Sequence, residues 1–298
     1  MSDPAVETTE ETILLEVLAS LHPSAKRNSL RRMVDHGRVR VDGDKATRAN
    51  MKVAKGSFVE VLSKADGDKP LTNPKQTIPD PEILFSDNEI IVVNKPAGLL
   101  SVATDRGEED TMFSRVAKWS WENGRKHTNL VHRLDRETSG CMIFARSIET
   151  KDILQSQFKD RSVERIYHAV VHREPEKDSG TINLRIHETK DKRVRLVEKG
   201  RRSGREAITH WSKEKVGPEH SLIRIKIDTG RRAQIRLHML HLGCPVAGDT
   251  RHGFGKASVN RLCLHATSLS FTHLDGERIT IGSEIPRQLM SELNRRLG

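Results

Sequence analysis

The stretch His132-Arg133-Leu134-Asp135-Arg136-Glu137-Thr138-Ser139-Gly140 sets one carboxylate between two guanidiniums, just ahead of a turn of small residues. The apolar run from Cys141 to Ala145 follows it and predicts a buried strand. An aspartate close to arginines stays ionised, because the opposite charges favour the anion. Such an aspartate is suited to act as a nucleophile or to stabilise positive charge, and poorly suited to donate a proton. In isolation the pattern would more often mark a solvated turn, so its interpretation depends on the rest of the chain.

The composition indicates a soluble, basic protein. The chain has 298 residues, enough for one large domain and a small one, with 31% charged and 35% apolar residues. Its formal net charge of +10 points to a polyanionic partner, most simply nucleic acid. The charge is clustered, because Ser24–Arg48 contains eight Lys or Arg against three acids. This clustering favours a binding face over an evenly solvated surface.

The three cysteines, Cys141, Cys244 and Cys263, lie far apart, and no C-x-x-C pair occurs. We therefore expect reduced, buried thiols, and neither a zinc site nor a disulfide framework. The N-terminus lacks the apolar core of a signal peptide, and no apolar run approaches the ~20 residues of a membrane span. These features predict a cytoplasmic protein without a membrane segment.

The N-terminal part of the chain predicts a small αβ module over residues 11–64, between a disordered acidic tail (1–10) and a linker (65–80). Apolar residues at helical spacing, a closing glycine and an Asp-Gly turn supply its elements. We expect helices over Ile13–Leu21 and Ser24–Gly37, a hairpin at Arg38–Gly43 and a strand over Val53–Leu62.

Residues 81–298 predict a second, larger domain in which strands and helices mix. A hairpin is expected from Ile83–Phe85 to Ile90–Val93, because a Ser-Asp-Asn-Glu turn joins the two runs. Charged residues dominate 172–206, which we expect to run over the surface. Further strands are predicted at Cys141–Ala145, Ile166–Val171, Ile208–Trp211 and Leu222–Ile227, and helices near Met112–Trp121 and Lys151–Lys159.

A second informative segment runs from Asp228 to Arg236, where a strand ends at a glycine turn before a helix. The segment is either a basic surface helix or a phosphate or carboxylate site at a helix N-terminus. A buried pair between Arg236 and Asp135 would fix the aim of that carboxylate. His238 and His241 share this helix, but no third ligand is evident, so we expect no metal site.

Tyr167 is the only tyrosine of the chain and lies on an apolar predicted strand. One interpretation is a core tyrosine whose hydroxyl reaches the edge of the core. The other is a ring that stacks on a nucleobase taken out of its helix.

Together these segments resemble the pseudouridine synthases of the RluA or large-subunit ribosomal RNA type, preceded by an S4-type RNA-binding domain. The likeness extends from about Thr12 and rests above all on His132–Gly140, which matches the motif H-R-L-D-x-x-T-S-G. The other matching segments are Ser24–Gly43, Lys95–Leu99, Arg165–Tyr167, Thr229–Arg236, Gly248-Asp249 and Leu264–Ala266.

The resemblance implies an α+β fold with a mixed, mainly antiparallel central sheet and flanking helices, plus the small S4-like domain. It also implies that Asp135 drives cleavage of a uridine glycosidic bond, that Tyr167 stacks on the flipped base, and that Arg236 pairs with Asp135. No metal and no organic cofactor is implied. The residues expected to contact RNA are Lys95, Arg133, Arg231 and Arg232, with Arg27, Arg31, Arg32 and Arg38 in the S4-like domain.

Three single positions and one short stretch depart from the family pattern. Ala233 stands where His is usual, His252 where Tyr is usual and Arg165 where Lys is common. Leu100-Ser101-Val102 replaces a frequent Val-His-Pro. None of these departures removes a residue of the expected chemistry, whereas Ala233 lies beside the arginines expected to face RNA and bears on the choice of substrate.

The leading hypothesis is therefore a monomeric enzyme that isomerises uridine in structured RNA, with large-subunit ribosomal RNA as the expected substrate. Transfer RNA is the alternative substrate. A non-catalytic RNA-binding or ribosome-assembly factor would explain the basic surfaces, but would not require Asp135, Tyr167 and Arg236 together. Hydrolysis of a glycosidic bond would usually need two carboxylates about 5–10 Å apart, and Glu137 is poorly placed to serve as the second.

Overall fold

The structure is a computed structural model that describes residues 5–62, 80–104, 107–124, 127–189, 193–197, 203–253 and 261–295. The chain divides into two compact units, Met1–Thr77 and Ile78–Gly298. The boundary falls within the predicted linker, of which residues 65–79 lie outside the described ranges. Each unit is described by itself.

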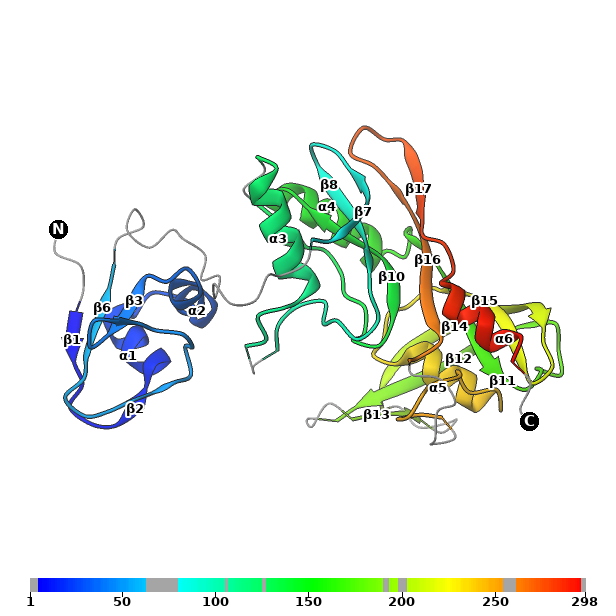
Figure 1. Ribbon diagram of the computed structural model, residues 1–298, viewed down its shortest axis with the longest axis horizontal. Helices are drawn as coiled ribbons and strands as arrows, with labels where there is room; N and C mark the ends of the chain where they lie inside the picture. The colour runs from blue at the N-terminus through cyan, green and yellow to red at the C-terminus, as the bar shows by residue number, and fades with distance from the viewer. Residues whose placement is uncertain are drawn as a thin grey trace. The chain divides into compact units, whose positions relative to one another are not determined.

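The first unit is a small sheet packed against two helices (Figure 1). Four strands lie in the order β1-β6-β3-β4, and β2 pairs with β5. Its core is apolar, with Leu14, Leu18, Leu30, Val39 and Val59 completely buried. The elements are β1 (Ala5–Glu7), β2 (Thr12–Ile13), α1 (Leu14–Leu21), α2 (Arg27–Asp35), β3 (Val39–Val41), β4 (Asp44–Lys45), β5 (Lys52–Val53) and β6 (Phe58–Val61).

Two predictions for this unit need correction. Residues Ala5–Glu7, assigned to a disordered tail, form β1 and pair antiparallel with β6, where Val6 lies opposite Val59. Backbone hydrogen bonds to β6 explain this difference, because they stabilise a strand whatever its side chains are. The low apolar content of the segment therefore does not prevent it from joining the sheet. The single strand expected over Val53–Leu62 is two strands, β5 and β6, separated by a turn at Lys55-Gly56.

The second unit is built on one large sheet, which confirms the prediction of a mixed, mainly antiparallel fold. Within the described residues its strand order is β13-β12-β14-β15-β11-β16-β10-β8-β7, with β17 beside β16 and β9 beside β10. The parallel neighbours are β10 and β16. The strands are β7 (Glu82–Ser86), β8 (Ile90–Lys95), β9 (Asn129–Leu130), β10 (Ser139–Ala145), β11 (Glu164–His172), β12 (Ser179–Glu188), β13 (Val194–Val197), β14 (Arg205–Val216), β15 (His220–Ile227), β16 (Leu264–Thr272) and β17 (Arg278–Gly282).

Four helices accompany this sheet: α3 (Met112–Glu122), α4 (Ile148–Lys159), α5 (Gln234–His241) and α6 (Arg287–Leu293). Local caps begin two of them. Thr111 and Ser114 form a reciprocal capping box before α3, and the Ser147 side chain accepts a hydrogen bond from the Thr150 N–H at the start of α4. These caps explain why the helices predicted near Met112 and Lys151 are present.

Strand β8 contains the uninterrupted apolar run Ile90–Val93. Its alternate residues point to opposite faces of the sheet. Ile91 and Val93 belong to the core cluster that contains Tyr167, whereas Ile90 and Val92 belong to a second cluster with Phe271. Because both faces of β8 are covered, its sequence is a continuous run of apolar residues and does not alternate between apolar and polar residues.

The prediction that residues 172–206 run over the surface without a core is wrong. This region contains β12 and β13, which complete one end of the sheet. Alternate positions of β12 carry Ile182, Leu184 and Ile186, and Ile182 and Ile186 are buried. Asn183 and Arg185, which lie between them, are exposed, and the high charge of the wider segment concealed a period-2 strand.

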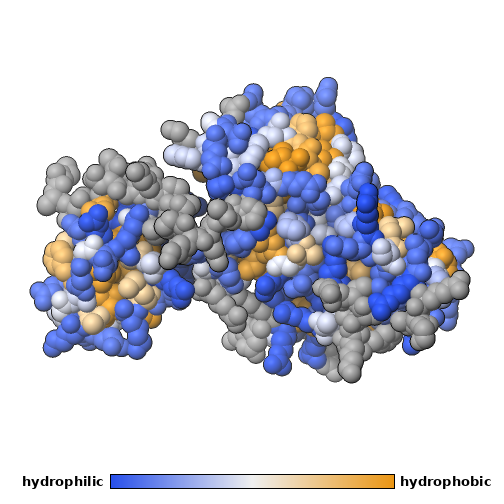
Figure 2. Space-filling view, viewed as in Figure 1, coloured by the Kyte–Doolittle hydropathy of each residue, from blue (hydrophilic) through white to orange (hydrophobic). Residues whose placement is uncertain are grey.

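Much of the face drawn in Figure 2 is hydrophilic, with apolar areas on each of the two units. Phe85 of β7 is a large apolar side chain that is 37% exposed. Cys141, Cys244 and Cys263 are free and buried, as predicted. Among the described residues, no helix has the length and apolar character needed to cross a membrane.

Candidate active site

The second unit contains a pocket of about 530 Å³, in the range of small-molecule sites. Its wall combines the loop before β10, the end of α4, strand β11, the loop before α5, the first turn of α5 and the start of β16. The sequence-predicted residues Asp135, Tyr167 and Arg236 all line it. So do Arg133, Arg231 and Arg232, whereas Lys95 does not.

Asp135 lies on a loop that several backbone hydrogen bonds hold in place. The Ser101 hydroxyl donates to the Leu134 carbonyl oxygen (2.7 Å) and accepts from the Leu134 N–H (3.0 Å). The Gly98 N–H donates to the Arg136 carbonyl oxygen (2.8 Å). These bonds fix the residues on both sides of Asp135. The Asp135 side chain is therefore held at the pocket wall by a well-anchored loop.

Lys95 is part of this support, and the prediction that it contacts RNA is wrong. Its side chain is fully buried, and its ammonium donates to the carbonyl oxygens of Pro96 (2.9 Å), Leu99 (2.7 Å) and Arg136 (3.1 Å). An ammonium has three donors, so none remains for a phosphate. Burial lowers the pKa of Lys95 to about 7, against the opposing effect of the Glu137 and Asp135 charges.

Gly140 brings β10 close to β16 directly after this loop. Its φ is +115°, and a Cβ there would lie 2.2 Å from the Ala266 carbonyl oxygen. No side chain fits this approach. The glycine that ends the motif is thus explained by the parallel pairing of β10 and β16, in which Gly140 lies opposite Ala266.

The predicted pair between Arg236 and Asp135 is absent from the described part of the chain. Arg236 instead binds Asp249 through two hydrogen bonds, from Nε (2.7 Å) and Nη2 (2.6 Å), and both side chains are buried. Asp249 also accepts the backbone N–H groups of Arg251 and His252. The guanidinium and these N–H groups hold the pKa of Asp249 below its ordinary value, although burial opposes them. Gly248-Asp249 was noted in the sequence, but its pairing with Arg236 was not foreseen.

Asp135 contacts a helix N-terminus instead. Its Oδ2 accepts the backbone N–H of Ala233, at 3.3 Å. Ala233 precedes the first residue of α5 and has a left-handed backbone (φ +51°). A carboxylate is stabilised there by the helix dipole and free N–H groups. The alternative that this segment forms an anion site is therefore the one that the geometry favours, with Asp135 as the anion.

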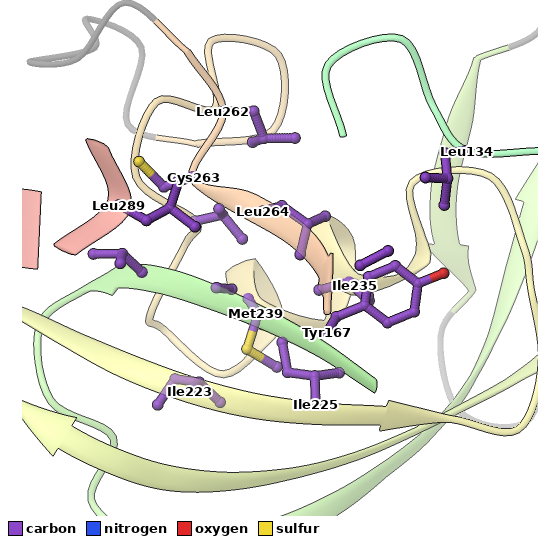
Figure 3. Packing of buried hydrophobic residues seen from close by; sticks show 14 of the residues in the cluster. Leu134, Tyr167, Ile223, Ile225, Ile235, Met239, Leu262, Cys263, Leu264 and Leu289 are labelled. Atoms are coloured by element: carbon purple, nitrogen blue, oxygen red, sulfur yellow. The ribbon is translucent and has the colours of Figure 1, made fainter. Parts of the chain in front are cut away.

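Tyr167 is packed in the core and also lines the pocket, and its stacking on a base stays a prediction. Figure 3 shows the ring packed near Ile235 of α5 and Leu264 of β16, with the hydroxyl pointing away from the packed cluster toward the side of Leu134. The residue is 8% exposed and lines the pocket. Burial raises the pKa of the Tyr167 phenol, so it stays protonated. One part of the ring supports the core, and the rest can meet a ligand.

The arginines at the pocket differ in exposure. Arg133 and Arg232 are exposed, and Arg232 forms a loose ion pair with Glu188 (3.4 Å). Arg231 is half-buried and donates from Nε to the Glu206 carbonyl oxygen (3.0 Å). Their contact with RNA stays a prediction.

The base of α5 is fixed by buried polar groups that sequence reasoning did not identify. Gln234 donates from Nε2 to the Ile208 carbonyl oxygen (2.9 Å) and accepts the Thr229 hydroxyl (2.8 Å). His238 forms a 2.8 Å hydrogen bond to the Thr209 hydroxyl. These bonds tie α5 to β14, and thereby hold Ala233 opposite Asp135.

His238 predicts a pH dependence of stability. It is fully buried, and burial lowers its pKa to about 4, below the ~6.5 of an unfolded histidine. Between pH 6.5 and about 4 the unfolded chain binds a proton that the folded protein excludes, so stability falls as pH falls, by about 1.4 kcal/mol per pH unit. Urea unfolding between pH 7 and 5 gives the slope of the unfolding free energy against pH. In His238→Asn this slope should be smaller by the contribution of one proton, about 1.4 kcal/mol per pH unit. His241→Asn, at an exposed position of the same helix, should keep it, and equal slopes in both variants would contradict the assignment.

Comparison with known proteins decides the family. A family model described as RNA pseudouridylate synthase matches residues 89–241, and an S4 domain matches residues 14–59. The chain belongs to the RNA pseudouridine synthase family. An uncharacterised RNA pseudouridine synthase of Bacillus subtilis is 32% identical over 93% of this chain and 91% of its own length. A ribosomal large subunit pseudouridine synthase D of Neisseria meningitidis is 32% identical over 91% of this chain and 75% of its own length.

A solved structure supports the fold. The human RNA pseudouridylate synthase domain containing 4 aligns with a TM-score of 0.61 at 24% identity, over 71% of this chain and 92% of its own. The family model and the relatives confirm the predicted resemblance, and the protein is an RNA pseudouridine synthase with an N-terminal S4 domain.

Proposed function

We propose that this synthase converts uridines of large-subunit ribosomal RNA to pseudouridine, with Asp135 as the catalytic residue. The observation that carries the proposal is that the Asp135 carboxylate and the Tyr167 ring line one pocket, beside a buried arginine. Relatives named as large-subunit ribosomal RNA synthases support the choice of substrate. Transfer RNA is the alternative within the same chemistry.

The proposed reaction begins when a uridine leaves its helix and enters the pocket, because the target base of a duplex is otherwise out of reach. The Asp135 carboxylate faces the sugar and promotes cleavage of the bond between C1′ and N1. The uracil turns while Tyr167 stacks against it, and C5 then joins C1′. C5 loses its proton and N1 gains one, so the product is an isomer of the substrate.

The Ala233 N–H has a defined part in this scheme. It donates to one carboxylate oxygen of Asp135 and fixes the direction in which the group points. The second oxygen is then the one that faces the substrate. Arg236, held by Asp249, adds a positive charge to the same wall without a direct ion pair to Asp135.

Mapping pseudouridine across all RNA of a strain that lacks this protein tests the substrate. We expect defined positions of large-subunit ribosomal RNA to revert to uridine, and to be restored by the wild-type gene. Loss confined to transfer RNA would replace the proposed substrate, and no loss in any RNA would overturn the function.

The S4 domain is expected to supply affinity. Arg27, Arg31 and Arg32 are exposed on α2, whereas Arg38 donates from Nε to the Leu62 carbonyl oxygen. Replacing the three exposed arginines with Gln should weaken RNA binding and flatten its dependence on log[salt] by about 2 to 3 units, since each phosphate contact contributes about 0.7–0.9. Filter binding at several salt concentrations measures this slope. Lys52→Gln, which removes an exposed charge paired with Glu11, is the control. An unchanged slope in the triple variant would assign α2 to another partner.

A further inference from the structure

Arg165 is a buried guanidinium whose hydrogen-bonding capacity is only partly used. The residue is 6% exposed. Its Nη2 donates to the carbonyl oxygens of Asp228 (2.8 Å) and Ile227 (3.3 Å). Among the described residues Nε and Nη1 have no acceptor, and no carboxylate lies within ion-pair distance. Buried donors are rarely left unsatisfied. The unused donors of Arg165 therefore indicate that a ligand supplies the missing acceptor.

The position of Arg165 relates it to the active site. It precedes Tyr167 by two residues on β11, and alternate residues of a strand share a face. Both side chains line the pocket that contains Asp135. Gly230 lies beside the unused Nη1, because a Cβ at Gly230 would come within 2.9 Å of that nitrogen. The absence of a side chain at Gly230 leaves Nη1 open to the pocket.

The chemistry of the group restricts what it can recognise. A guanidinium has five N–H donors and no acceptor. Uracil carries carbonyl oxygens at O2 and O4, whereas cytosine presents an amino group in place of O4. A buried guanidinium therefore complements uracil and would oppose the amino group of cytosine. RNA phosphates are the other acceptor, but Arg133 and Arg232 are the exposed arginines of the pocket, while Arg165 is enclosed.

We propose that Arg165 is a specificity-determining residue that donates a hydrogen bond to O4 of the everted uracil, where cytosine carries an amino group, and so distinguishes uracil from cytosine. The inference rests on the proposed function and adds to it the residue that reads the base. Phe158, whose ring centre is 5.5 Å from the Arg165 guanidinium carbon, supports the side chain from the pocket wall.

The test compares variants on large-subunit ribosomal RNA transcribed in vitro with uridine tritiated at C5. Tritium release is followed in single turnover with saturating enzyme, and RNA affinity by filter binding. Arg165→Met should slow release about 10- to 100-fold, the scale of losing a charged hydrogen bond, and leave affinity and its salt dependence unchanged. Arg165→Lys should recover part of the rate. Arg161→Met, which removes an exposed arginine paired with Glu206 (2.8 Å), is the matched control and should react like the wild type.

Two outcomes of the Arg165→Met experiment would overturn the assignment. An unchanged rate in Arg165→Met would remove Arg165 from base recognition. A loss of affinity with a shallower salt slope and an unchanged rate would instead assign Arg165 to a phosphate. If Arg165→Met does not fold, Gly230→Ala decides, since it keeps the guanidinium but crowds Nη1. We expect Gly230→Ala to slow release at unchanged affinity, and a normal rate would contradict the inference.

Transcripts with 2-thiouridine or 4-thiouridine in place of uridine identify the base atom, because sulfur accepts hydrogen bonds weakly. Conversion is measured by chromatography of the nucleosides, and binding to Asp135→Asn protein checks that the transcripts still fold. 4-Thiouridine should slow the wild type but have little further effect on Arg165→Met, whereas 2-thiouridine should not distinguish the two proteins. Equal slowing of both proteins would overturn the contact. A wild type that releases no tritium from any RNA would overturn the proposed function itself, and this inference with it.

Discussion

Asp135→Asn is expected to lower tritium release from C5-labelled RNA by at least about 1,000-fold, the scale on which removal of a catalytic side chain acts. The amide is close in size to the carboxylate and can still accept the Ala233 N–H through its oxygen, so the loop keeps its geometry. What the amide lacks is the negative charge that the proposed bond cleavage uses.

RNA binding separates this effect from misfolding. The affinity of Asp135→Asn should stay within about 3-fold of the wild type, because the phosphate contacts that dominate affinity are made by other residues. Asp152→Asn, at an exposed position of α4, controls for loss of one carboxylate and should react normally. Substantial release by Asp135→Asn would remove Asp135 from the chemistry.

Arg236→Met is expected to destabilise the protein by about 3–5 kcal/mol, because it leaves the Asp249 carboxylate buried without its partner. Urea unfolding measures the loss. Asp249→Asn in the Arg236→Met background should recover part of it, since the buried charge is then gone while one oxygen still accepts the N–H groups of Arg251 and His252.

A matched control lies one turn before Arg236. Arg232 is exposed, and its ion pair with Glu188 is of the kind that contributes about 0–1 kcal/mol. Arg232→Met should therefore change the free energy of unfolding little. If Arg236→Met were no less stable than Arg232→Met, the buried pair with Asp249 would not be formed in solution.

Local patterns in the sequence were sufficient for much of the fold. The run Ile90–Val93 and its turn predicted the hairpin of β7 and β8, because the signal lies within a few residues. β12 was missed because its charged residues obscured the alternation of Ile182 and Ile186. β1 was missed because its partner β6 lies some fifty residues away, and a short polar segment carries no sign of such pairing.

The candidate site was predicted in its members but not in its contacts. Asp135, Tyr167 and Arg236 share a pocket, as the motifs indicated. The partners of Asp135 and Arg236 are distant in sequence, and charge alone does not determine which groups pair. Arg236 binds Asp249, and Asp135 accepts a backbone N–H, which no pattern of side chains predicts. The family motif placed Lys95 among the residues expected to contact RNA, whereas in the fold its ammonium donates to three carbonyl oxygens.

The most direct test of the Asp135 assignment is made in the cell. Pseudouridine would be quantified, by mass spectrometry of ribosomal RNA, at the positions that revert to uridine in the deletion strain, in a strain whose chromosomal gene encodes Asp135→Asn at normal protein level. The account predicts uridine at every one of those positions. Pseudouridine retained there would mean that Asp135 is not required for the isomerisation, and the account would fail.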